Sequence, residues 1–205
     1  VANCTFRDCR GLALEEVDGG IMENISINNI TMMDTPAYGI YITTGKRNRT
    51  PNLSTNSRAR NIDISNVIMD GVGKMSGIQI MGLPELPVEG VRLDNIRLIS
   101  DGGGTAEDAA RTPKELGDSY PEPRRLGTLP SYGVYARHVK DLELANITTS
   151  FKTNDLRPAI VCNDVNGLDI DSFKPQIADG VTPAKFENVY GLTIHMSPLL
   201  KTKAN

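Results

Sequence analysis

A short phrase returns four times along the chain, and its recurrence restricts the fold more than any other feature of the sequence. In each copy apolar and polar residues alternate with a period of two, and an asparagine stands just before a β-branched residue. The copies begin at Ile25, Ile62, Val91 and Leu142. Alternation of this kind indicates a strand with one buried face, and its repetition is typical of stacked coils. The sequence therefore predicts a β-solenoid.

The asparagine of each phrase is expected at one corner of a coil. The four positions are Asn29, Asn66, Asn95 and Asn146, and Ser172 takes the same place in a weaker copy. If these side chains turn inward, they can bond the backbone and stack on one another, each net bond contributing roughly 0.5–1.5 kcal/mol. We therefore expect a buried asparagine ladder, in which the Asn-X-Ser/Thr sequons among these positions carry no sugar.

A second strand is expected in each coil, usually after a glycine. Aligning these strands gives an inward column of Leu14, Ile42, Ile80, Ala136, Cys162 and Phe186. The outward column consists of Glu15, Thr43, Met81, Arg137, Asn163 and Glu187. Apolar residues inside and mainly polar residues outside are what stacked parallel strands require.

Composition sets further bounds. The 205 residues include 19 Gly and no Trp, and the formal charge of -3 argues against a nucleic-acid partner. No stretch reaches the roughly 20 apolar residues of a membrane span, and the first residues resemble no signal peptide. A single domain over 1–205 is expected, without metal or cofactor. Cys4, Cys9 and Cys162 are interpreted as small buried hydrophobes, although Cys4 and Cys9 could pair across a turn.

Two long excursions, 46–60 and 100–132, interrupt the strands, and loops on a rigid scaffold are where function concentrates. The first is basic and includes Arg47 and Arg49, which suits either a carboxylate-bearing ligand or a solvated insertion. In the second, Thr105 is expected to cap a short helix, and Tyr120-Pro121-Glu122-Pro123 favours extended backbone.

Several of these segments, taken together and in order, carry a family resemblance. They are Asn3-Cys4-Thr5-Phe6, Gly19-Gly20-Ile21-Met22-Glu23-Asn24-Ile25, Tyr120-Pro121-Glu122-Pro123, Leu129-Pro130-Ser131-Tyr132-Gly133 and Arg157-Pro158-Ala159-Ile160. Over essentially its whole length the chain resembles the C-terminal half of family 28 glycoside hydrolases, the polygalacturonase-like pectinases, of bacterial type. The resemblance implies a right-handed parallel β-helix, inverting hydrolysis of pectin, and a periplasmic or extracellular location.

The family's catalytic motifs do not accompany this resemblance. Asn-Thr-Asp, Asp-Asp and Gly-His-Gly are absent, and the strand that resembles Arg-Ile-Lys reads Ala13-Leu14-Glu15. Geometry leads to the same expectation, because an inverting hydrolase needs two carboxyls roughly 6.5–9.5 Å apart. In its own outward column Glu15 has no acid neighbour. Corner positions explain Glu16, Asp18 and His138, and His195 is expected at the surface. We therefore predict no catalytic residue in this chain.

The sequence thus favours the C-terminal β-helix segment of a pectin-degrading glycoside hydrolase, inactive alone. The alternative is a non-catalytic solenoid that binds carbohydrate or supports assembly. Candidate contacts to a pectic oligo- or polysaccharide are Glu15, Arg47, Arg49, Tyr120, Glu122, Arg124 and Tyr132. Since no polar segment covers the first coil near Phe6, we also expect self-association through that end. The C-terminal end is expected to resist such association, because proline and charge follow its last strand in Ser197-Pro198 and Lys201-Thr202-Lys203.

Overall fold

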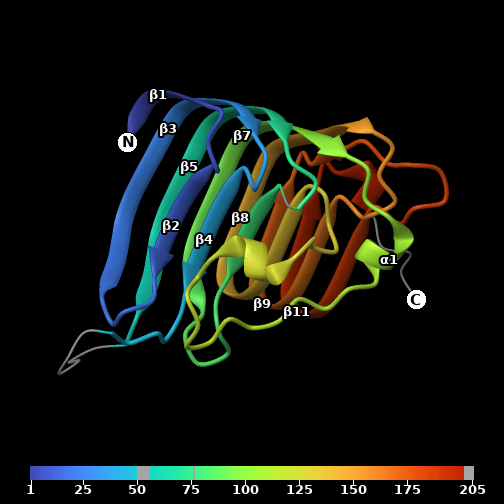
Figure 1. Cartoon of the computed structure of the whole chain (residues 1–205). Coiled ribbons are helices and arrows are strands. Elements are labelled where there is room, and N and C mark those ends of the chain that lie inside the picture. The colour runs from blue at the N-terminus through green and yellow to red at the C-terminus, as the bar shows by residue number, and fades with distance from the viewer. Residues whose placement is uncertain (50–55, 76, 201–205) are drawn as a thin grey trace.

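A computed structural model describes residues 1–49, 56–75 and 77–200, and its regular structure is almost entirely β-strand. The chain winds in coils, and equivalent strands of neighbouring coils pair in parallel. These strands stack side by side from the N-terminal end of the molecule to the C-terminal end (Figure 1). The predicted parallel β-helix is confirmed.

Two sets of strands build the stack. The first set is β1 (Ala2–Arg7), β3 (Ile21–Thr35), β5 (Arg58–Val72) and β7 (Val88–Gly102). The second set is β2 (Leu12–Glu16), β4 (Ile40–Thr44) and β6 (Ile78–Met81). Both sets join in β8 (Val134–Thr153), which is followed by β9 (Ile160–Asp171), the short β10 (Lys174–Pro175) and β11 (Ala184–His195). From β8 onward the two expected strands of a coil are therefore one continuous strand, which bends at His138 with a φ of 54°.

The strand register matches the two predicted columns. Leu14 pairs with Ile42, and the same column continues without a shift to Phe186. Its central members are wholly buried, and its two end members are half-buried. Three members of the outward column, Thr43, Met81 and Arg137, are also buried. The second excursion packs over this face, since Leu126 and Leu129 form an apolar cluster with Met81.

The asparagine ladder exists, but the prediction that it is buried is wrong. All four asparagines are exposed, and their φ angles lie between 52° and 56°. Among non-glycine residues asparagine adopts this left-handed backbone most readily, so the corner conformation explains its selection. Outside the coil Asn95 donates to Asn66 over 2.7 Å, whereas Asn146 donates to Asp94 over 3.0 Å. Ser172 holds the same corner with a φ of 56°, as its alignment predicted.

The excursions are shorter than predicted, because the alternation of the strands extends into both. Arg58 and Arg60 belong to β5, and Ser100 to Gly102 belong to β7. Residues 50–55 of the first excursion lie outside the described residues. In the second, Thr105 caps α1 (Ala106–Ala109) as expected, with Asp108 completing a capping box. In the Tyr-Pro-Glu-Pro segment Glu122 is extended as predicted, whereas Pro123 already begins the 3-10 helix η1 (Pro123–Leu126).

A buried ion pair ties both ends of the second excursion to the coil. Arg157 and Asp155 are wholly buried, with 2.7 Å between Arg157 Nη2 and Asp155 Oδ2. Asp155 accepts the backbone N–H of Gly104, at the start of the excursion, over 3.0 Å. Arg157 donates to the carbonyls of Leu129 and Ser131, near its end, over 3.1 and 3.2 Å. Both charges are thus satisfied, as burial requires.

The two ends of the stack differ. At the N-terminal end, Phe6 and Leu12 of β1 and β2 are only half-buried, although they pack on the core. At the other end, η2 (Pro198–Leu200) places Leu200 against the core, with 2% of it exposed. Lys201-Thr202-Lys203, predicted to add charge there, lies outside the described residues.

The three cysteines and the terminal histidine are also placed. Cys162 is buried as predicted, whereas Cys4 and Cys9 are half-buried. All three thiols are free, so the pairing of Cys4 with Cys9 is not formed. His195 is exposed, as expected for a surface histidine.

The corner geometry predicts how substitutions at Asn66 rank. Asn66→Leu should lower the free energy of unfolding by about 1–2 kcal/mol, because leucine is strained in the left-handed region. Asn66→Gly should cost less, since glycine adopts that backbone freely. The control Asn166→Leu, at an exposed strand position without positive φ, should change stability by less than about 0.5 kcal/mol. Urea denaturation measures all three, and an equal loss for Gly and Leu at position 66 would contradict the backbone explanation.

Candidate functional site

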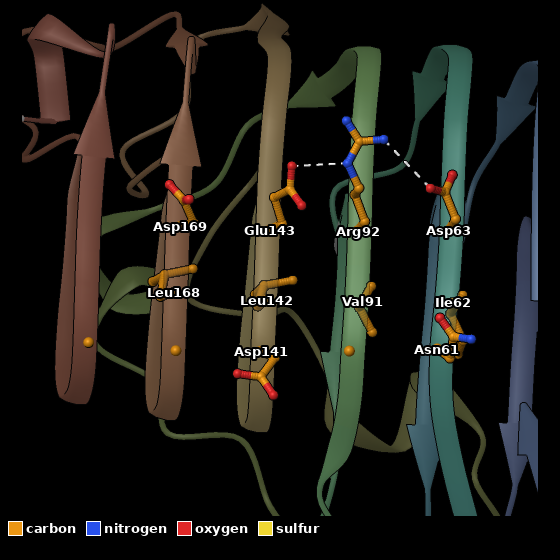
Figure 2. Close-up of a pocket in the computed structure, with 13 residues that line it drawn as sticks. Asn61, Ile62, Asp63, Val91, Arg92, Asp141, Leu142, Glu143, Leu168 and Asp169 are labelled. Atoms are coloured by element: carbon orange, nitrogen blue, oxygen red, sulfur yellow. Dashed lines mark hydrogen bonds and ion pairs between the residues drawn. The ribbon is translucent and has the colours of Figure 1, made fainter. Parts of the chain in front are cut away.

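A groove of about 440 Å³ lies on the outside of the stack (Figure 2). It follows a corner column that includes Gly90 and Gly167, beside a row of charged side chains with one member per coil. In this row Arg92 lies 2.9 Å from Glu143 and 3.6 Å from Asp63. The groove is therefore made by repeating positions of the coil, and much of its charge is paired within it.

The groove also contains two adjacent outward acids, which lie outside the column of Glu15. Glu143 and Asp169 are register partners on β8 and β9, and both point outward from the coil (Figure 2). The prediction that Glu15 has no acid neighbour concerned its own column alone. These two residues belong to a different face of the coil, and both are exposed. An exposed pair of this kind is typical of a solvated surface.

A second concavity, of about 140 Å³, forms where three distant segments converge. Strand β2 supplies Glu15 on the outward face of the first coil, and the loop after β4 supplies Arg47. The second excursion supplies Tyr120. The remaining lining residues are Glu16, Val17, Asp18 and Pro121. We call this concavity the excursion cleft, and it contains three of the residues selected from sequence.

Arg47 is fixed on one side of the excursion cleft. Its guanidinium donates from Nε to Asp18 Oδ1 over 2.9 Å and makes a second bond to the other carboxylate oxygen. These bonds, with the backbone N–H of Arg49 adding to them, lower the pKa of Asp18 to about 2. The guanidinium carbon also lies 5.1 Å from the centroid of the Tyr120 ring. Arg47 thus links the first excursion to the second, and 52% of Tyr120 remains exposed.

The other side of the site carries two carboxyls in different surroundings. Glu122 forms an ion pair with Arg10 over 3.0 Å, and its Oε1 atom is buried without a hydrogen-bond partner in the described structure. Desolvation raises the pKa of Glu15, the nearby charge of Glu122 adds to this effect, and Arg47 opposes it. The excursion therefore gives Glu15 an acid neighbour that its own column lacks.

The other acids that line the excursion cleft have partners. Glu16 Oε1 accepts the backbone N–H groups of Asp18 and Gly20 over 3.0 and 2.8 Å, as a corner residue would. Asp18 is held by Arg47. Among the described residues, no hydrogen bond or ion pair involves the carboxyl of Glu15. One acid of the cleft is thus free to meet a ligand.

Four residues selected from sequence do not line this cleft, and one of them is Glu122, the acid neighbour of Glu15. The prediction for Tyr132 is wrong, because the residue is 0% exposed and its hydroxyl donates to the carbonyl of Gln176 over 2.5 Å inside the coil. Arg49 is exposed and supplies only its backbone N–H to Asp18. Arg124 is exposed on η1, outside the cleft lining.

Two tyrosines beside the cleft were missed. Tyr41 is the register partner of Ala13 and lies with its ring centroid 5.8 Å from that of Tyr38. Both rings are buried, and burial followed by the charge of Glu15 raises the pKa of Tyr38. Ala13 lies two residues before Glu15, so it faces outward on the same strand. Aligning this position across the coils would have identified its partner, Tyr41. Tyr38 lies just before a strand and gave no such signal.

His138 holds the corner predicted for it and anchors the second excursion. Its Nε2 lies 3.0 Å from Glu115 of the excursion, and its Nδ1 lies 2.6 Å from Asp164 of the next coil. These contacts give the histidine a structural position. Across residues 1–49, 56–75 and 77–200, no three His, Cys, Asp or Glu side chains are grouped to hold a metal ion. None of the described helices is long and apolar enough to cross a membrane.

Comparison of the chain with protein-family models, with curated proteins and with solved structures gives no match.

The raised pKa of Glu15 predicts a pH-dependent stability. A carboxyl whose pKa is higher in the folded chain than its ordinary 4.5 costs stability once the pH rises above that value. Glu15→Gln should therefore raise the free energy of unfolding at pH 7, and the gain should shrink toward about pH 4. Urea denaturation of both proteins across this range measures the difference.

Glu187 supplies a control of opposite sign in the same outward column. Hydrogen bonds from Lys185 and Asn163 lower its pKa, so its carboxylate favours the folded state at neutral pH. Glu187→Gln should lower stability at pH 7. The same sign of change for both variants would contradict the described surroundings of Glu15.

Proposed function

We propose that this chain forms one wall of a carbohydrate-binding cleft, as the C-terminal β-helix segment of a pectin-degrading glycoside hydrolase. The observation that carries the proposal is the convergence of Glu15, Arg47 and Tyr120 at one concavity from three distant segments. Repeating coil positions cannot produce this combination. The sequence resemblance to polygalacturonase-like pectinases supplies the substrate class.

The chemistry of the excursion cleft suits a sugar. An exposed aromatic ring offers a face on which the C–H face of a pyranose can pack, and Tyr120 presents such a ring, fixed by Arg47. A carboxylate accepts hydrogen bonds from sugar hydroxyls, and the carboxyl of Glu15 is available for them. The buried, unpaired Oε1 of Glu122 lies in the same region and offers a further acceptor if the excursion shifts.

The same pairings argue against hydrolysis by this chain alone. Glycosidic cleavage with inversion needs one carboxyl as acid and a second, free carboxylate as base. Glu122 is bound by Arg10, and Asp18 is bound by Arg47. Only Glu15 remains without such a partner in the described cleft. The catalytic carboxyls of the proposed enzyme would therefore come from other coils.

Isothermal titration with an oligosaccharide from rhamnogalacturonan tests the proposal. We expect the chain to bind it and Tyr120→Ala to weaken binding at least about fivefold, as loss of about 1 kcal/mol of ring stacking implies. Tyr190→Ala is the matched control, since Tyr190 is also exposed but lies on β11, away from the cleft lining. No reducing ends should appear in the same samples. Absence of binding, or turnover that Glu15→Gln abolishes, would contradict the proposal.

A non-catalytic carbohydrate-binding or assembly module is the second candidate, favoured by the paired state of Glu16, Asp18 and Glu122. The two candidates share the same binding site and differ in the rest of the protein. Coding sequence for further coils with paired aspartates, upstream of Val1, would support the enzyme.

We also propose that the 205-residue polypeptide associates with itself through its first coil. The half-buried side chains of Phe6 and Leu12 leave apolar surface at that end, beside the unpaired edges of β1 and β2. Phe6→Lys should shift the polypeptide toward monomer, because a charge would then lie in the contact. Light scattering at tens of micromolar measures this, and a monomeric parent chain would contradict it.

A further inference from the structure

We infer that the sugar unit held in the excursion cleft is neutral and rich in hydroxyls, and that a uronate is disfavoured there. The inference rests on the proposed function and specifies the ligand class of the same site. It follows from how the charges of the cleft are paired. Sequence composition had suggested the opposite, because the first excursion is basic and arginine suits a carboxylate.

Arg47, which lines the cleft, and Arg10, which pairs with Glu122, are already occupied by carboxylates. Arg47 uses both Nε and Nη2 on Asp18, which is the bidentate geometry that a uronate carboxylate would otherwise take. Arg10 is engaged by Glu122 over 3.0 Å. A uronate that took the Nε–Nη2 edge of Arg47 would have to displace Asp18 and leave that carboxylate without its cation.

The groups that remain available are acceptors. The carboxyl of Glu15 has no cation partner in the described structure, and the Oε1 atom of Glu122 has no hydrogen-bond donor. The two residues also influence each other electrostatically, since Glu122 contributes to the raised pKa of Glu15. Placing a third carboxylate beside them adds like-charge repulsion.

A neutral sugar avoids these costs and satisfies the same atoms. Neighbouring hydroxyls can donate to the two oxygens of Glu15 while one ring face lies on Tyr120. Hydroxyl donors to a charged acceptor form the stronger class of hydrogen bond. Arg49 is exposed nearby but does not line the cleft, so its charge is screened by solvent.

A matched pair of ligands tests the inference. An oligogalacturonide and its carboxyl-reduced derivative share one backbone and differ only in charge. By isothermal titration at pH 7, the reduced form should bind at least about tenfold more tightly, because the acidic form places a like charge beside Glu15 and Glu122. Glu15→Gln should narrow the difference to about threefold or less. Arg49→Gln serves as the control and should leave the ratio unchanged.

The outcomes separate the inference from the proposed function. Equal or tighter binding of the acidic form overturns the inference and leaves carbohydrate binding in place. A preference that persists unchanged in Glu15→Gln also overturns it, because the discrimination would then arise elsewhere. If neither ligand binds, the proposed function itself fails, and the inference fails with it.

Discussion

Parallel strands stay in register along this stack because corners that recur from coil to coil turn with the same backbone geometry. At two corner columns a residue in the left-handed region recurs, and the chain mainly supplies asparagine, aspartate or glycine there, whereas the column of His138 adopts this backbone from β8 onward. One such column holds Asn24, Asn61, Gly90, Asp141, Gly167 and Gly191. Because these corners coincide, the faces between them are flat, and both the apolar interior and the outward columns follow from them.

The excursion cleft combines side chains from three segments that are not equivalent positions of the repeating coil. Its carboxylates, arginine and exposed ring come from β2, from the loop after β4 and from the second excursion. The buried pair of Asp155 and Arg157 determines where that excursion starts and ends, because it bonds the backbone at Gly104 and at Leu129. A ligand site on the first coil thus depends on an ion pair several strands away along the stack. The contacts of His138 with Glu115 hold the middle of the same segment.

The sequence predicted the repetitive part of the molecule closely and the rest only in part. Strand register from Leu14 to Phe186 follows from alternation and alignment, since both reflect burial. Alternation and alignment could not predict whether the asparagine side chains point inward or outward, because a buried ladder and a left-handed corner both favour asparagine. Tyr132 was taken for a loop residue, although its segment re-enters the core. The meeting of Glu15 with Glu122, over a hundred residues apart, depends on loop packing that leaves no local pattern.

The equivalence of neighbouring strands has an evolutionary consequence. β5 pairs with β3 on one side and β7 on the other at equivalent positions, so each coil meets nearly the same partner surface above and below. Interactions in such an array are mainly between nearest neighbours. A whole coil could therefore be duplicated or lost by recombination, and the strands on either side of it would still pair in the same register. The length of the molecule, and with it the number of surfaces on which new loops can arise, is free to vary while its cross-section is conserved by geometry.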